Sequence, residues 1–168
     1  MQITGERRGP GDSVVSDGIQ APRTSAHLLQ IQGFVAGDLP APPIARLIGY
    51  VGIHAELGHV IAELEVDGKH MNQMGTVAGG VICDLADAAM GPAMATTLED
   101  EESFTTIDLT AKYLKPVRKG RLRATAHVIK RTRTLGLIEC AVTDETGSLV
   151  AKAVSTCMVL RERSAQGR

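Results

Sequence analysis

Aromatic residues are scarce in this sequence of 168 residues. Two Phe, two Tyr and no Trp make up 2% of the chain, whereas hydrophobic residues of all kinds make up 43%. Proteins that grip bases or sugars commonly stack them on aromatic rings, so the composition disfavours a stacking platform. The core must be built from Ala, Val, Ile, Leu and Met, and the length is typical of one compact domain.

An excess of positive charge and a long apolar run are also absent. The 18 Lys+Arg and 19 Asp+Glu give a net charge of -1, which argues against a basic surface that neutralises phosphates. The apolar stretches end well short of the ~18 residues of a spanning helix, and Arg7 and Arg8 precede no apolar signal segment. We therefore expect no nucleic-acid partner and no membrane role.

Cysteines are few and odd in number. Cys83, Cys140 and Cys157 each lie within an apolar run, as reduced buried thiols do in cytosolic proteins. This pattern predicts a cytoplasmic protein with no disulfide, no zinc and no other metal site.

The first part of the chain differs in composition from the rest. Residues 1–24 are rich in Gly, Ser, Asp, Arg and Pro without apolar periodicity, and we interpret them as a flexible leader. A single domain is expected over 25–163, followed by a short tail at 164–168. Two short helices are expected near 28–34 and 44–48, each ended by a glycine.

The apolar residues of the domain follow the periodicity of β-strands in some segments and the pattern of a buried helix in another. Residues 51–56 and 59–66 predict strands around a tight turn, and residues 81–94 predict a helix that is apolar on nearly every side, with a weak point or kink at Pro92. Strands are then expected, in the order 103–114, 121–131, 135–143 and 149–160. Short turns force these strands to pair antiparallel. The predicted fold is α+β, with a curved antiparallel β-sheet wrapped around a central α-helix, the shape called a hotdog fold.

The start of that helix is the first candidate site. Gly79 and Gly80 let another backbone or a ligand approach, and the unpaired N–H groups of a helix N-terminus can donate to a negatively charged oxygen. Close packing of helix against sheet would equally explain two glycines. His70 and Asn72, just upstream, are either ligands or polar loop residues that satisfy local backbone groups.

Two carboxylates within the apolar helix are the second candidate site. A carboxylate is costly to bury unless it is paired, so Asp87 among Ala, Leu and Met indicates a functional position. Asp84 lies three residues away and shares a helix face with it, and either one could simply face solvent. Cys83 has no cationic neighbour in sequence and is interpreted as core rather than nucleophile.

The whole stretch resembles a known family. The pattern His70-x-Asn72-x-x-Gly75-Thr-Val-Ala78-Gly79-Gly80-x-x-x-x-Leu85-Ala86-Asp87 is similar to the PaaI-like branch of hotdog-fold acyl-CoA thioesterases, whose motif is N-x-x-G-x-x-H-G-G followed by L-x-D. Similarity at 42–49, 113–116 and 144–147 extends the resemblance over about residues 38 to 160.

The resemblance implies roles for particular residues. Asp87 takes the place of the catalytic general base or nucleophile, the Gly79 N–H and the Asn72 amide polarise the thioester carbonyl, and Thr106 holds the attacking water. No cofactor is implied beyond the coenzyme A that is part of the substrate. The family's histidine before the glycine pair is Ala78 here, which leaves room for reduced activity, a different substrate or a binding protein. The alternative function is therefore non-catalytic binding of acyl-CoA or of an acyl chain.

Further substrate contacts are expected around this centre. His70, Gly80 and Met74 are predicted to contact the substrate, with Met74 one of several methionines that suggest an adaptable apolar pocket. Lys130, Arg131 and Arg133 are candidates for the coenzyme A phosphates, although basic residues at strand ends usually face solvent.

The distance between the two candidate sites predicts an oligomer. Gly79 and Asp87 are eight residues apart, which is about 12 Å along one helix, too far for one thioester carbon to meet both. Two chains with antiparallel helices would complete two equivalent sites, so we expect a homodimer with sites at the dimer interface. The resemblance to the family implies that such dimers can pair further into a homotetramer. A hotdog hydratase is disfavoured because no His and Asp pair of that family's arrangement is found.

Overall fold

The computed structural model describes residues 25–161, and the expected leader and tail lie outside them. The order of elements begins α1 (Ala26–Ala36), α2 (Pro43–Ile48), β1 (Tyr50–Glu56), β2 (His59–Val66), η1 (Gly68–His70) and α3 (Gly79–Ala95). It continues with β3 (Glu102–Tyr113), β4 (Gly120–Arg131), β5 (Leu135–Asp144) and β6 (Leu149–Arg161). Within this range no helix combines the length and the apolar character needed to cross a bilayer.

Local sequence explains how the short helices start and stop. Ser25 caps α1 by accepting a hydrogen bond from the Leu28 N–H, and α1 ends at Gly37 with φ 81°. α2 starts at Pro43, where a missing N–H costs nothing, and it ends at Gly49 with φ 97°. Both helices were predicted, and both end at the expected glycine.

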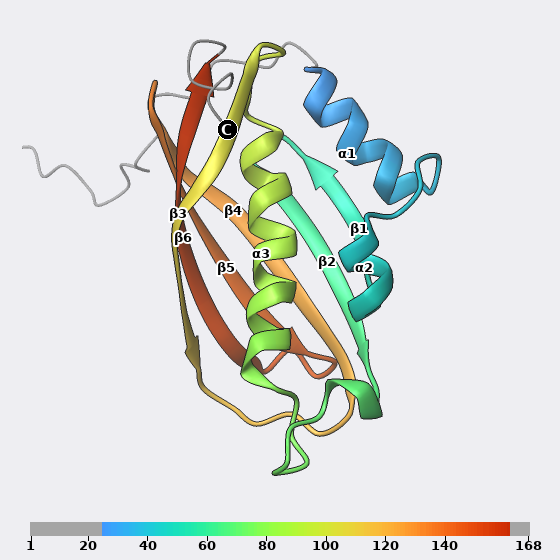
Figure 1. Cartoon of the computed structure of the whole chain (residues 1–168). Coiled ribbons are helices and arrows are strands. Elements are labelled where there is room, and N and C mark those ends of the chain that lie inside the picture. The colour runs from blue at the N-terminus through green and yellow to red at the C-terminus, as the bar shows by residue number, and fades with distance from the viewer. Residues whose placement is uncertain (1–24, 162–168) are drawn as a thin grey trace, which may run out of the picture.

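The six strands form one antiparallel sheet in the order β1-β2-β4-β5-β6-β3. Figure 1 shows this sheet curving around α3, which confirms the predicted α+β arrangement of a curved sheet about a central helix. α1 packs beside β1, and β3 forms the opposite edge of the sheet. The two edges are therefore not equivalent, because β3 has no helix of the described chain packed along its outer side.

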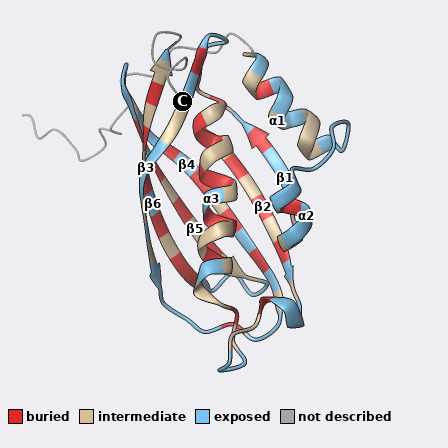
Figure 2. Cartoon of the chain, viewed as in Figure 1, coloured by how far each residue is buried: buried red, intermediate tan, exposed pale blue. Residues whose placement is uncertain are grey.

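Alternation along the strands builds the core between sheet and helix. From Val60 to Leu64 in β2 and from Leu122 to Val128 in β4 every second residue is buried, and Figure 2 shows the alternating bands along the sheet. The buried residues form the apolar face toward α3, and the charged residues of these segments lie on the outer face. Several of the buried sheet positions are alanines, which let the helix come close: Ala62, Ala124, Ala126, Ala151 and Ala153. Cys140 and Cys157 are buried, as expected, whereas Cys83 is only half-buried and does not belong to the core, contrary to its interpretation from the sequence.

The central helix is longer than the sequence predicted, and it is not interrupted at its proline. α3 continues through Pro92 to Ala95, although Pro92 was expected to weaken or kink it. Buried side chains before and after the proline, including Met90 and Met94, pack into the sheet on both sides of that point. Tertiary packing thus outweighs the single missing N–H of Pro92.

Candidate functional site

The N-terminus of α3 carries two N–H groups ahead of the helical hydrogen-bond ladder. The Val81 N–H and the Ile82 N–H both donate to the Ala78 carbonyl oxygen, at 3.0 and 3.3 Å. The N–H groups of Gly79 and Gly80 precede these bonds, and Ala78 offers no side-chain cap. A developing negative charge on an oxygen is favoured at such a helix end.

The two glycines have different surroundings. The Tyr113 hydroxyl donates to the Gly79 carbonyl oxygen at 2.9 Å, and a Cβ at Gly79 would lie 3.2 Å from the Tyr113 ring. Gly79 therefore does permit close packing, which was the alternative explanation for the pair. A Cβ at Gly80 would meet nothing within 4 Å, so Gly80 leaves open surface for a ligand or a second chain.

Asn72 organises the loop in front of the helix. Its Oδ1 accepts hydrogen bonds from the Met74 and Thr76 N–H groups, and its Nδ2 donates to the Thr76 hydroxyl at 3.1 Å. The loop also turns at Gly75, whose φ of 68° suits glycine. Asn72 thus holds the loop in place, and its Nδ2 has a second hydrogen that can be donated to a ligand.

His70 fits the second of its two explanations, that of a polar residue that satisfies nearby backbone groups. The ring is 2% exposed, its Nδ1 accepts from the Asp67 N–H at 3.0 Å, and its Nε2 lies 2.7 Å from the Ile48 carbonyl oxygen. Since a backbone N–H must donate to Nδ1, the hydrogen of a neutral ring is on Nε2 and is donated to Ile48. Both nitrogens are occupied, so we leave His70 out of the proposed substrate contacts.

An open groove lies between α3 and β3, and it contains the principal candidate residues. Its volume is about 430 Å³, and it is lined by Gly80, Cys83, Asp84, Asp87, Thr106 and Leu109. The structure thereby brings Asp87 and Thr106 together from two elements that are distant in sequence. A carboxylate and a hydroxyl on opposite walls of one groove can hold a water molecule between them.

A β-bulge determines which β3 side chains reach the groove. The pairing of β3 with β6 shifts register between Thr106 and Asp108, so Ile107 is the extra residue. Thr106 and Leu109 are three apart and would point to opposite faces of a regular strand, but after the bulge both line the groove. Leu109 was missed by sequence reasoning because no residue pattern here indicates the bulge.

The electrostatic surroundings distinguish the ionisable groups of the groove. Partial burial raises the pKa of Asp87, and burial together with the charge of Asp87 raises the pKa of Asp84. Burial and the two nearby carboxylates raise the pKa of Cys83, which keeps it a thiol and disfavours a nucleophilic role.

The pKa of Tyr50 is raised by burial and then by the same two carboxylates, which places this tyrosine near the groove. Tyr50 was also missed, since only the topology brings it there.

The open face of α3 corrects the expectation of a helix wrapped on nearly every side. Asp87 and Gly80 are exposed in the single chain, and Cys83 and Asp84 are half-buried on the same helical stripe (Figure 2). Asp87 therefore lies on the open side of α3 rather than on its apolar side. The composition of the helix suggested full burial, whereas the sheet covers only part of its circumference.

The remaining predicted residues are not assembled around the groove within one chain. Gly79 and Asp87 lie on the same helix, eight residues apart, so about 12 Å separates them along its axis. Met74 is 78% exposed on the loop that Asn72 organises. Lys130 lies near the end of β4, and Arg133 lies in the turn between β4 and β5.

Arg131 is bound to another residue. Its guanidinium lies 2.6 Å from Glu102 Oε2, and both side chains are largely buried. Arg161 donates to the other oxygen of the same carboxylate. Releasing Arg131 would remove one of the two cations that neutralise the buried Glu102 carboxylate, so we leave Arg131 out of the proposed phosphate contacts.

Known proteins resemble this chain in sequence and in fold. The model of the Thioesterase superfamily matches residues 74–151. Acyl-coenzyme A thioesterase 13 of Homo sapiens is 32% identical over 114 residues, which are 66% of this chain and 81% of that protein. The 1,4-dihydroxy-2-naphthoyl-CoA hydrolase of Listeria monocytogenes is 29% identical over 71% of this chain and 98% of its own length.

A solved structure agrees with these relatives. A mutant form of the phenylacetic acid degradation protein PaaI from Thermus thermophilus superposes with a TM-score of 0.65 and 26% identity, covering 70% of this chain and 98% of that one. The residues that the family model matches run from Met74, within the loop, through α3, β3, β4 and β5 to the first residues of β6. The chain belongs to the hotdog-fold thioesterase superfamily, in its PaaI-like branch, and is a thioester hydrolase.

Proposed function

We propose that this protein hydrolyses acyl-CoA thioesters at sites shared between two chains, with Asp87 as the catalytic carboxylate. The observation that carries this proposal is the groove on the open side of α3, which Asp87 and Thr106 both line. The relatives whose names include acyl-CoA or naphthoyl-CoA substrates support a coenzyme A thioester as the substrate class.

In the proposed reaction a water molecule lies between the Thr106 hydroxyl and the Asp87 carboxylate. Asp87 accepts a proton from this water molecule while the water oxygen attacks the thioester carbonyl carbon. The carbonyl oxygen becomes negative, and the Gly79 N–H with the Asn72 amide of a second chain stabilises it. The carbon–sulfur bond then breaks, and the sulfur takes a proton to give free acid and coenzyme A. The raised pKa of Asp87 makes it a stronger base than an ordinary aspartate.

Direct attack by the Asp87 carboxylate on the carbonyl carbon is the other form of this mechanism. It would give a mixed anhydride that water hydrolyses in a second step. Both forms require Asp87 beside the thioester carbon and the same oxyanion donors, so the residue assignments are the same for each.

The exposed edge of β3 supports a dimer with this geometry. β3 is 12 residues long and hydrogen-bonds to β6 on one side, and an unpaired edge of this length invites pairing with another strand. Large apolar side chains on or next to this edge are exposed in the single chain, namely Ile107, Tyr113 and Leu114. A second copy across this edge, with the two α3 helices antiparallel, would cover them and would bring its Gly79 toward Asp87.

The second candidate function is non-catalytic binding of acyl-CoA. The observation that favours it is Ala78, a residue without a polar side chain at the position of the family's histidine. No imidazole is then available there to orient the thioester or the leaving group.

The test is hydrolysis of a panel of acyl-CoA esters, followed with a thiol-trapping dye. We expect turnover by the wild-type chain, a loss of kcat of about 100-fold or more in Asp87→Asn, and a much smaller loss in Asp84→Asn. Asp84→Asn is the matched control because it makes the same chemical change one helical turn away. Saturable binding of acyl-CoA without release of thiol would establish the binding protein, and equal losses in both variants would remove the special role of Asp87.

A further inference from the structure

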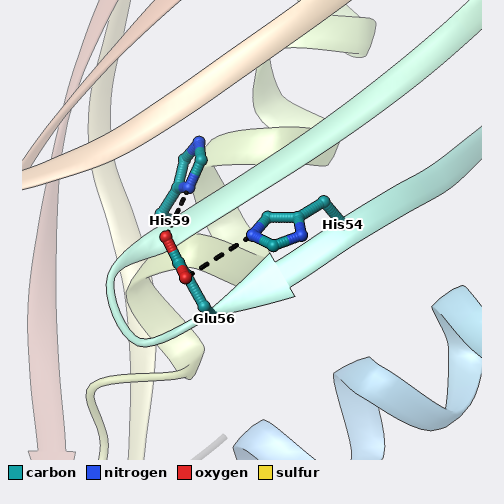
Figure 3. Close-up of side chains that lie close together, drawn as sticks. All are labelled: His54, Glu56 and His59. Carbon is teal, nitrogen blue, oxygen red and sulfur yellow. Dashed lines mark hydrogen bonds and ion pairs between the residues drawn. The ribbon is translucent and has the colours of Figure 1, made fainter.

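We propose that His54, Glu56 and His59 form a binding site for a divalent transition-metal ion such as Zn²⁺ at the tip of the β1–β2 hairpin. Figure 3 shows the three side chains converging, with the Glu56 carboxylate between the two imidazole rings. His59 Nδ1 lies 2.9 Å from Glu56 Oε1, and His54 Nε2 lies 3.7 Å from Glu56 Oε2. One ligand atom from each residue lies within 4.8 Å of the others.

The type and spacing of these atoms suit a metal ion. Imidazole nitrogens and a carboxylate oxygen are common zinc ligands at about 2.0–2.2 Å, and in a tetrahedral site ligand atoms are then about 3.3 Å apart. The two measured separations fall on either side of that value. The side chains of His54 and Glu56 are 45% and 62% exposed, so small rotations can bring all three ligands to one ion.

The hairpin holds this arrangement in place before any ion binds. The Gly58 N–H at its turn donates to the Thr96 hydroxyl at 2.7 Å, and the Gly58 carbonyl accepts from the Val128 N–H at 2.8 Å. The His59 ring stacks on His127 of β4, with centroids 4.2 Å apart and planes 6° from parallel. These contacts fix both the turn and the ring, so little order must be gained on binding.

A simple hydrogen bond between Glu56 and His59 would account for only two of the three side chains. His54 comes from the other side of Glu56 and turns Nε2 toward the second oxygen of the same carboxylate. Two imidazoles from different strands around one carboxylate are the donor set of a three-ligand metal site with a fourth position open to water. The expectation of no metal site rested on the three cysteines alone, and it did not consider the spacing His-x-Glu-x-x-His across a tight turn.

The proposed metal site is separate from the thioesterase groove. Along β2, Val60 is buried toward α3, whereas the neighbouring His59 lies on the outer face of the sheet. Because the ligands come from β1 and β2, a bound ion would join the two strands at their turn. We therefore infer that the ion crosslinks the two strands of the hairpin. One of its coordination positions is occupied by water, which a further oxygen or nitrogen ligand can replace.

The test uses the full-length chain without an affinity tag. Titration with Co²⁺, followed by visible absorption, and calorimetry with Zn²⁺ should each show one ion per chain. His54→Gln and His59→Gln should each lower the affinity by about tenfold or more. His27→Gln is the matched control, because it removes an imidazole from α1, outside this cluster, and it should bind Zn²⁺ as the wild type does.

Thermal unfolding supplies a second readout that does not depend on activity. Zn²⁺ should raise the melting temperature of the wild type but not that of His54→Gln, whose exposed position makes a folding defect unexpected. The proposal is wrong if wild-type protein binds no Zn²⁺ at millimolar concentration, if either ligand variant binds as tightly as the wild type, or if His27→Gln abolishes binding.

Discussion

At the scale of single residues, Asp84 and Asp87 occupy one groove but have different surroundings. Asp84 Oδ2 is buried and has no hydrogen-bond partner among the described residues, whereas the Asp87 side chain reaches solvent. A buried carboxylate oxygen without a donor costs free energy when it is charged. Asp84 is thus expected to destabilise the folded chain when it is charged, whereas Asp87 is the carboxylate on which we propose that hydrolysis depends.

Asp84→Asn is therefore expected to stabilise the protein at neutral pH. The pKa of Asp84 is raised in the folded chain, so between the ordinary pKa near 3.8 and the raised value the folded state binds more protons than the unfolded state. The free energy of unfolding then falls as the pH rises through that window. Asn removes this cost, and we expect a gain of about 1 kcal/mol at pH 7.

The measurement is denaturant unfolding of both proteins at pH 3 and pH 7. At pH 3 Asp84 is largely protonated in both the folded and the unfolded chain, so the free energy of unfolding should differ little between variant and wild type. A stabilisation that is the same at both values of pH would show that the charge of Asp84 is not its cause.

Thr106→Val tests the second residue of the groove. If the hydroxyl holds the attacking water, it acts mainly in the transition state, and its loss should lower kcat roughly tenfold, or about 1.4 kcal/mol, with little change in KM. Val has nearly the same shape as Thr, and Thr106 Oγ1 has only a long 3.8 Å contact to Cys157 Sγ, so folding should be retained. Steady-state kinetics with normal kcat would exclude Thr106 from the site.

At the scale of elements, the approach of α3 to β5 depends on one glycine. A Cβ at Gly136 would collide with the sulfur of Met94, which is fully buried. Gly136→Ala should lower the free energy of unfolding by about 1–3 kcal/mol, the usual cost of overpacking. Gly68→Ala, where a Cβ meets nothing within 4 Å, should change it by about 0.5 kcal/mol or less in denaturant titrations. Equal effects of the two changes would contradict this account.

The sequence predicted the elements well but not their irregularities. Residues 103–114 and 121–131 were expected as strands, and the structure has Glu102–Tyr113 and Gly120–Arg131, because alternation reports burial on one face directly. The bulge at Ile107 left no such signal, and it decides that Thr106 and Leu109 share a face. The exposed side of α3 could likewise not be predicted from the sequence, since the composition of a helix does not say how far a sheet wraps around it.

The site was predictable to a similar extent. The resemblance indicated Asp87 and Thr106, and the structure brings these two into one groove. It could not distinguish His70 from a ligand, because the hydrogen bonds of that ring to Asp67 and Ile48 arise from tertiary structure. It likewise could not show that Arg131, a candidate for the coenzyme A phosphates, is paired with Glu102, which is 29 residues away in sequence.

At the scale of the whole molecule, the unpaired edge of β3 and the open face of α3 are expected to meet a second chain. Ile107→Asp would place a charge on this edge, where the side chain is 56% exposed in the single chain. We expect this variant to be monomeric and to lose hydrolysis roughly tenfold or more. Ile129→Asp is the matched control, because Ile129 is also exposed but lies on β4, inside the sheet order.

Light scattering and acyl-CoA hydrolysis at the same protein concentration measure both properties. If Ile107→Asp remains a fully active dimer, the interface does not include this edge. If Ile129→Asp also dissociates, the effect of the charge is not specific to β3.

The shared site is tested most directly by subunit complementation. Asp87→Asn and Gly79→Pro chains are each expected to be inactive, and the exposed Tyr113 ring can move to accommodate the proline beside it. Equal amounts, mixed under conditions that allow exchange, should give heterodimers for about half of the dimers, each with one intact site, and so about one quarter of wild-type activity. No recovered activity in verified heterodimers, or a wild-type monomer that is fully active, would contradict a site formed by two chains.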